Sequence, residues 1–207
     1  MADNYLERRQ EELSSAQKKV VKRNHLSLDT LLRRNRSYRG YDPSRKVTEA
    51  ELRELIATLP FTASGMNRQP LRFRLVTDAS LLMPHITLGA ALPEEHLHKP
   101  GMEPSAFLVI CCAVPEDKVV DIDLGFAAQS ILLKATEKGL GGIFILNFRK
   151  EAVKQALQLP LTPIALIALG KPAESVFLVP SSGEDLSYYR KEGVHYVPKL
   201  AVDQLII

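Results

Sequence analysis

The sequence predicts a mixed domain in which helices pack around a single sheet. Four short runs rich in apolar residues have the length of strands, and longer segments with helical periodicity separate them. With 207 residues and 45% hydrophobic content, the chain can bury one sizeable core without disulfides or structural metals. Strands that are separated by helices in this way indicate an α/β or α+β fold.

The four strands are expected at residues 71–76, 106–114, 141–146 and 164–169. In the first, apolar and basic residues alternate, which is typical of a strand with one covered face. The second contains the only two cysteines of the chain, Cys111 and Cys112. Since neighbouring residues of a strand point to opposite faces, we interpret these as two core residues and not as a disulfide or a metal pair.

Five helices are expected, at residues 5–23, 27–34, 48–59, 121–138 and 150–157. Ser27 is a suitable N-cap, and Thr48 with Glu51 has the spacing of a capping box. The fourth helix carries apolar residues on several sides, which predicts a central buried helix. Gly139 directly follows it, at a position where glycine commonly ends a helix.

Both ends of the chain differ from this core. We predict an N-terminal helical arm at residues 1–26, a core domain at residues 27–180 and an extended C-terminal arm at residues 181–207. Apolar residues on both arms have no evident place in the core, and arms of this kind suggest a dimer that exchanges them. A further segment, residues 88–104, holds three prolines and two glycines, which indicates a mobile excursion.

Charge and hydropathy exclude several classes of protein. The net charge of +3 arises from 27 basic and 24 acidic residues spread along the chain, so no overall field points to nucleic acid. The longest apolar runs are far shorter than the roughly 20 residues of a membrane span. The N-terminus also lacks the apolar centre of a signal peptide. We therefore expect a cytoplasmic protein that has no membrane or nucleic-acid partner.

Four arginines lie close together where the second helix gives way to a loop, at Arg33, Arg34, Arg36 and Arg39. A run of basic residues is often only a solvated face. Here Ser37 lies between two of them, and a hydroxyl group together with planar guanidinium groups suits a phosphate monoester. The cluster is therefore a candidate anion site.

A second candidate is the loop of residues 64–70. Gly65 permits a close approach of the backbone, and Asn67 and Gln69 each offer both a donor and an acceptor. Such groups suit the edge of a flat heterocycle with mixed donors and acceptors, for example a flavin pyrimidine ring. A turn capped by its own side chains is the alternative interpretation of the same residues.

Two other patterns have simpler explanations. Residues 139–142, Gly-Leu-Gly-Gly, resemble a dinucleotide fingerprint, but they follow a helix and open a strand, which is the reverse of the required order. A helix end followed by close backbone packing explains them better. His96 and His98 are the only close pair of histidines, and we interpret them as solvent-exposed residues. No metal site is expected.

Taken together, the motifs resemble those of the nitroreductase family. The family's Arg-Arg-Ser-x-Arg-x-Phe pattern corresponds to residues 35–41, with Asn35 in place of the first arginine. Its Pro-Ser-x-x-Asn-x-Gln-Pro loop corresponds to residues 63–70, with Ala63 in place of the first proline. Further matches are a Gly-x-Ala-x-Gln helix at 125–129, a Gly-Leu-Gly turn at 139–141 and Leu-Gly-Lys-Pro at 169–172.

This resemblance implies an α+β fold with a central, mostly antiparallel sheet flanked by helices, in a homodimer with swapped arms. It implies FMN as the cofactor, at two sites on the dimer interface. The activity would be that of an oxidoreductase that passes hydride from NADH or NADPH through the flavin to a small acceptor, such as a nitroaromatic, a quinone or an enone. No catalytic triad is expected, because the flavin carries the chemistry.

The resemblance also implies roles for particular residues. The FMN phosphate would be held by Arg36, Ser37 and Lys199, and Arg39 would lie near the pyrimidine edge of the ring. A second subunit would reach the flavin with Ser64, Gly65, Asn67 and Gln69. The backbone of Leu146 and Asn147 would contact the reactive ring nitrogen.

Two functions from other classes remain as alternatives. One is a flavin-binding sensor or carrier without efficient turnover, which would use the same cofactor residues. The other is a nucleic-acid-associated module that uses the arginine cluster of residues 33–39.

Overall fold

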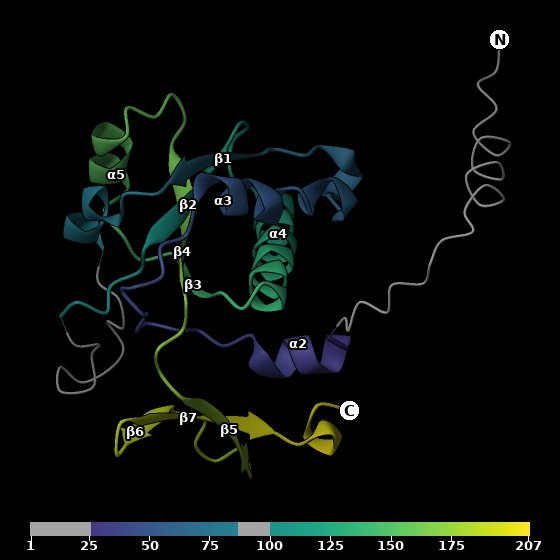
Figure 1. Ribbon diagram of the computed structural model, residues 1–207. Helices are drawn as coiled ribbons and strands as arrows, with labels where there is room; N and C mark the ends of the chain where they lie inside the picture. Colours follow the sequence, from purple (N-terminus) through teal and green to yellow (C-terminus); the bar gives the residue numbers. More distant parts are fainter. Residues whose placement is uncertain (1–25, 87–99) are drawn as a thin grey trace, which may run out of the picture.

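The computed structural model describes residues 26–86 and 100–207, which form a layered domain and a smaller C-terminal sheet (Figure 1). The predicted helix at residues 5–23, and residues 88–99 of the predicted excursion, lie outside the described residues. No helix in the described part of the chain is both long and apolar enough to span a membrane.

The main sheet consists of β1 (Leu71–Val76), β2 (Ala106–Cys112), β3 (Gly141–Ile145) and β4 (Pro163–Gly170). Their order in the sheet is β1-β2-β4-β3, and each neighbouring pair is antiparallel. The four strands predicted from the sequence are confirmed, and their ends differ from the prediction by two residues at most. The antiparallel arrangement that the resemblance implied is confirmed as well.

Both faces of this sheet are covered, because β2 and β4 are buried along their whole length. Along β2, Leu108 packs in one cluster of buried residues and Phe107 packs in the other. Cys112 and Cys111 divide between the same two clusters, and both thiols are free. Their interpretation as two core residues on opposite faces is therefore confirmed.

The helices are α2 (Leu28–Arg34), α3 (Glu49–Ile56), α4 (Lys118–Glu137) and α5 (Lys150–Ala156). Residues of α3 and α4 cover one face of the sheet, and residues of α5 cover the other (Figure 1). The central helix begins earlier than predicted, because the Asp117 carboxylate accepts a hydrogen bond from the backbone N–H of Val120 over 2.8 Å. It ends as predicted at Gly139, whose φ is +73°. Short 3-10 turns occupy Leu59–Phe61, Gly65–Asn67, Ala79–Leu81, Met83–His85 and Val202–Gln204.

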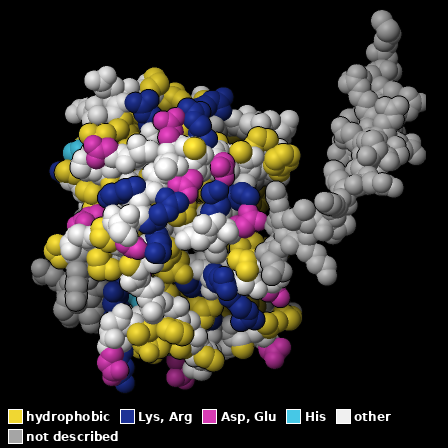
Figure 2. All heavy atoms as spheres, in the orientation of Figure 1, with side chains coloured by type: hydrophobic (Ala, Val, Ile, Leu, Met, Phe, Trp, Pro, Cys, Tyr) yellow, Lys and Arg dark blue, Asp and Glu magenta, His cyan; other side chains and the backbone are white. Residues whose placement is uncertain are grey.

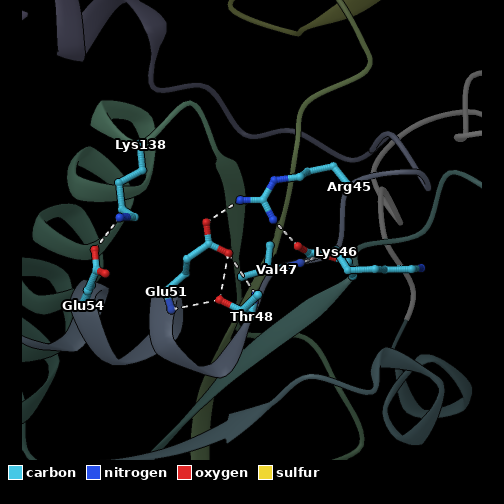
Figure 3. A network of polar contacts seen from close by, with 8 residues as sticks. Arg45, Lys46, Val47, Thr48, Glu51, Glu54 and Lys138 are labelled. Atoms are coloured by element: carbon cyan, nitrogen blue, oxygen red, sulfur yellow. Dashed lines mark hydrogen bonds and ion pairs between the residues drawn. The ribbon is translucent and has the colours of Figure 1, made fainter.

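The predicted capping box holds the start of α3 (Figure 3). The Thr48 hydroxyl accepts the backbone N–H of Glu51 over 3.2 Å, and the Glu51 carboxylate accepts the backbone N–H of Thr48 over 3.0 Å. Burial acts to raise the pKa of Glu51, but hydrogen bonds from Arg45 and Thr48 outweigh it and lower the pKa. An ion pair between Glu54 and Lys138 joins α3 to the residue that follows α4.

Three further strands form a separate sheet, with β5 (Val176–Ser181), β7 (Val194–Leu200) and β6 (Tyr189–Lys191) in that order. β7 runs parallel to β5 and antiparallel to β6. Glu192 and Gly193 join β6 to β7 with positive φ values of +52° and +79°, as a tight hairpin turn requires. This second sheet is not predicted from the sequence, which indicates only an extended arm, and the predicted boundary at residue 180 falls within β5.

We predict that Thr48→Ala lowers the free energy of unfolding by about 1 kcal/mol, because the backbone N–H of Glu51 loses its acceptor. Chemical denaturation followed by circular dichroism would measure the change. Ser182→Ala, at an exposed position after β5, serves as the control and should leave the midpoint unchanged. Equal midpoints for Thr48→Ala and the control would contradict a stabilising role of the capping box.

Candidate functional site

The segment of residues 36–42 lies against the start of β3. Ser37 forms a parallel bridge with Gly142, and the backbone N–H of Tyr38 donates to the Gly142 carbonyl over 3.2 Å. A Cβ atom on Gly141 would lie 2.5 Å from the Tyr38 ring, so a side chain there would prevent this approach. The glycines after α4 therefore serve close backbone packing, as the sequence predicts.

A buried carboxylate holds the same segment from the connection between β4 and β5. Glu174 accepts hydrogen bonds from the backbone N–H groups of Arg39 and Gly40. Its second oxygen pairs with Arg190 of β6. The side chains of Glu174 and Arg190 are only 6% and 12% exposed, so water screens the pair little. Glu174 is not predicted from the sequence, because a single acidic residue after a proline has no distinctive pattern.

These contacts border a cavity of about 380 Å³, which we call the arginine cavity. It is lined by four of the predicted cofactor residues: Arg36, Ser37, Arg39 and Lys199. The sequence does not predict that Tyr188 and His195 also line it, since they reach the cavity only when the C-terminal sheet forms. The fold thus brings the arginine cluster together with a lysine from the far end of the chain.

The arginine cavity has unused hydrogen-bond donors. The Nε atoms of Arg36 and Arg39 are buried, and neither has a hydrogen-bond partner in the described part of the chain. Burial lowers the pKa of Arg36, and the neighbouring Tyr38 acts in the opposite direction. A buried donor without a partner costs about 1–3 kcal/mol, and a bound anion would remove that cost. On the face drawn in Figure 2, basic and acidic side chains are interspersed, so attraction to an anion would be local.

The loop of residues 64–70 is anchored to α4 by a second buried carboxylate. The Ser64 hydroxyl donates to one oxygen of Asp123 over 2.6 Å, and the backbone N–H of Gly65 donates to the other over 2.7 Å. Asp123 is only 3% exposed. It is not predicted from the sequence, although an acidic residue among the apolar positions of a buried helix was an available signal.

The conformation of this loop is constrained. Met66, Asn67 and Gln69 have φ values of +51°, +53° and +45°, a region that non-glycine residues occupy at a cost and often at functional sites. A Cβ atom on Gly65 would lie 2.2 Å from the side chain of Val119. The Gln69 amide donates to the Asn67 amide oxygen over 2.8 Å. Both amides are exposed and partly satisfy each other, which agrees with the alternative interpretation of a self-capped turn.

The 64–70 loop borders a second cavity of about 460 Å³, between α3 and β1. Ser64 and Gln69 line this cavity, and Asp123 forms part of its wall. The arginine cavity also borders α4, at Gln129 and Leu132. Asp123 and Ala127 of α4 line the second cavity, whereas Gln129 and Leu132 face the arginine cavity. Two residues turn an α-helix by about 200°, so these two pairs lie on opposite sides of α4. Within one chain, the two groups of predicted flavin contacts are therefore separate.

The remaining predicted contacts, Leu146 and Asn147, directly follow β3. Both residues are exposed, and they line neither cavity. Across residues 26–86 and 100–207, no group of three or more His, Cys, Asp or Glu residues could hold a metal ion. The pair His96 and His98 lies outside the described residues.

Comparison with protein families identifies the chain. The family described as Nitroreductase family matches residues 32–171. This chain belongs to the nitroreductase family. The match runs from the last turn of α2 to the residue after β4, so it includes both the 36–42 segment and the 64–70 loop. A comparison with curated proteins finds no significant match.

Solved structures share the fold of this nitroreductase family chain. A nitroreductase family protein from Clostridium novyi NT has a TM-score of 0.58 at 22% identity, over 71% of this chain and 86% of that chain. A protein from Parabacteroides distasonis ATCC 8503, whose name includes NADH dehydrogenase and NAD(P)H nitroreductase, has a TM-score of 0.56 at 25% identity, over 79% and 96%. The structure of a protein from Exiguobacterium sibiricum 255-15, in complex with FMN, has a TM-score of 0.57 at 17% identity, over 72% of this chain and 90% of that chain. The predicted α+β fold with an antiparallel sheet and flanking helices is confirmed.

We predict that Asp123→Asn destabilises the 64–70 loop by about 1–3 kcal/mol, because an amide cannot accept at both positions that Ser64 and Gly65 now use. Amide hydrogen exchange at Gly65 and Gln69 should become faster. Asp121→Asn is the matched control, since Asp121 is exposed on the same helix. Unchanged exchange in Asp123→Asn would show that the carboxylate does not hold the loop.

Proposed function

We propose that this chain is an FMN-dependent oxidoreductase. The observation that carries the proposal is the arginine cavity, which Arg36, Ser37, Arg39 and Lys199 line together. The buried Nε–H groups of the two arginines have no hydrogen-bond partner among the residues that the structure describes. This donor set suits a phosphate monoester beside a ring that accumulates negative charge. Family membership and the FMN complex of the similar Exiguobacterium structure support the same cofactor.

Each residue of the arginine cavity receives a role in this proposal. Arg36, Ser37 and Lys199 would hold the phosphate, and Arg39 would lie near the pyrimidine edge of the ring. When bound, FMN would supply two-electron chemistry, accepting hydride from NADH or NADPH and delivering it to a small acceptor such as a nitroaromatic, a quinone or an enone. The positive charge of Arg39 would stabilise the anionic reduced ring. The backbone of Leu146 and Asn147 would offer an N–H group to the reactive nitrogen.

We also propose a homodimer in which Ser64, Gly65, Asn67 and Gln69 of one subunit complete the arginine cavity of the other. The position of the two cavities on opposite sides of α4 supports this arrangement. Large apolar side chains are exposed on α2, α4 and the neighbouring 3-10 turns, at Leu28, Leu32, Phe61, Met66, Ile122 and Phe126.

Gly125 gives separate support to the dimer. It lies within α4, where glycine costs about 1 kcal/mol relative to alanine. Among residues 26–86 and 100–207, nothing other than its chain neighbours and the backbone of its own helix lies within 4 Å of the position that its Cβ would take. A closely packed second subunit would explain why a glycine stands there. A cytoplasmic location belongs to the same proposal, with support from the two free, buried cysteines.

We predict that the purified protein shows a flavin absorbance spectrum, that NADH or NADPH bleaches it, and that a nitroaromatic or quinone restores it within seconds. Stopped-flow absorbance under anaerobic conditions measures both half-reactions. Bound flavin that stays oxidised at saturating nicotinamide would favour the alternative, a flavin-binding sensor or carrier. Absence of flavin together with salt-sensitive retention on DNA would favour a nucleic-acid-associated module.

Substitution of the two arginines should separate their roles. We predict that Arg36→Ala weakens FMN binding by about 10- to 100-fold, through loss of charge-assisted hydrogen bonds to phosphate. Arg39→Ala should mainly lower the reduction potential of the bound flavin. Arg33→Ala, at an exposed position of α2, is the control. Fluorescence titration and potentiometry measure the two effects, and wild-type FMN affinity in Arg36→Ala would overturn the phosphate assignment.

A further inference from the structure

Residues that follow β4 in the sequence contact both the backbone and the side chain of Arg39. Its backbone N–H donates to Glu174, which pairs with Arg190 of β6. Its guanidinium carbon lies 5.4 Å from the centre of the Tyr188 ring. We infer that Glu174, Arg190 and Tyr188 are positioning residues for Arg39, through which the C-terminal sheet sets the preference of the site for reduced over oxidised FMN. This inference rests on the proposed function.

The backbone anchor requires a carboxylate. One Glu174 oxygen accepts from two consecutive N–H groups, those of Arg39 and Gly40, and the other accepts from Arg190. All three partners are donors, and a carboxylate offers acceptors at both ends, whereas an amide offers only one. Removing the charge of either Glu174 or Arg190 would leave the other charge buried without compensation. The rigid pairing of these two side chains therefore requires both charges.

The side-chain anchor limits where the Arg39 charge can lie. Its Nη1 donates to the Ser37 carbonyl over 3.2 Å, and the Tyr188 ring lies close enough for a cation–π interaction. The Nε atom is buried without a partner in the described part of the chain. Tyr188 directly precedes β6 and Arg190 lies in it, so both anchors depend on the same strand.

This geometry links the C-terminal sheet to the redox preference. Reduction of FMN adds negative charge to the ring, and the attraction between that charge and a guanidinium depends on their separation and on the exclusion of water. A displaced Arg39 would therefore favour the reduced form less, even with the phosphate contacts of Arg36 and Lys199 unchanged. Loss of a purely structural pair would lower stability without changing this preference.

The test compares Glu174→Gln with wild type as holoenzymes. The midpoint potential of bound FMN gives the ratio of two dissociation constants, that of oxidised FMN divided by that of reduced FMN. This ratio should fall by about tenfold. Glu49→Gln is the matched control, because it removes one partner of the exposed pair with Arg53 and should leave the ratio unchanged. A variant that unfolds at a lower temperature but keeps the wild-type ratio would overturn the inference.

Tyr188→Leu gives a second test that leaves the buried ion pair intact. The ratio should fall by about threefold through loss of the cation–π contact. Tyr189→Leu is its control, because Tyr189 stacks on Tyr196 instead. An unchanged ratio in Tyr188→Leu would overturn the inference even where Glu174→Gln does not fold. Wild-type protein that binds no FMN would overturn the proposed function itself, which separates the two failures.

Discussion

Burial of both faces of β2 and β4 is the constraint on which the other parts of this nitroreductase family chain depend. A sheet with two apolar faces must be covered twice, and α3 and α4 cover one face while α5 covers the other. α4 packs across the sheet with nine buried residues, and this packing fixes its direction. One region of the helix therefore holds the 64–70 loop, and another lines the arginine cavity.

Two buried carboxylates hold the two segments that border the candidate site. Asp123 binds Ser64 and Gly65, and Glu174 binds the backbone of Arg39 and Gly40. Removing a charged group from water is costly unless several hydrogen bonds compensate, so each carboxylate favours one conformation of the backbone it contacts. The side chains that face the cavities are thus positioned by residues that do not themselves face a cofactor in the proposed function.

The secondary structure could be predicted wherever local chemistry dominates. The predicted N-cap at Ser27 and the predicted capping box at Thr48 are confirmed. They could be predicted because these side chains bond to backbone groups within the next turn. The helix α4 begins at Lys118, before the predicted residue 121, because its N-cap Asp117 lies outside the apolar pattern that defines the predicted helix. The C-terminal sheet was not predicted, since its central contact pairs β5 with β7, two strands that are not consecutive in sequence.

By itself, the sequence determined the strands and helices of the core, the family resemblance, and the residue types that suit a phosphate and a flavin edge. These features depend on periodicity and on motifs of a few residues, which are local properties of a chain. The tertiary structure alone decided that Tyr188 and His195 join Arg36 in one cavity, and that the 64–70 loop borders another. It also assigned Asp123 and Glu174 their partners. Contacts between residues far apart in sequence depend on how packed elements meet, and no local pattern records that.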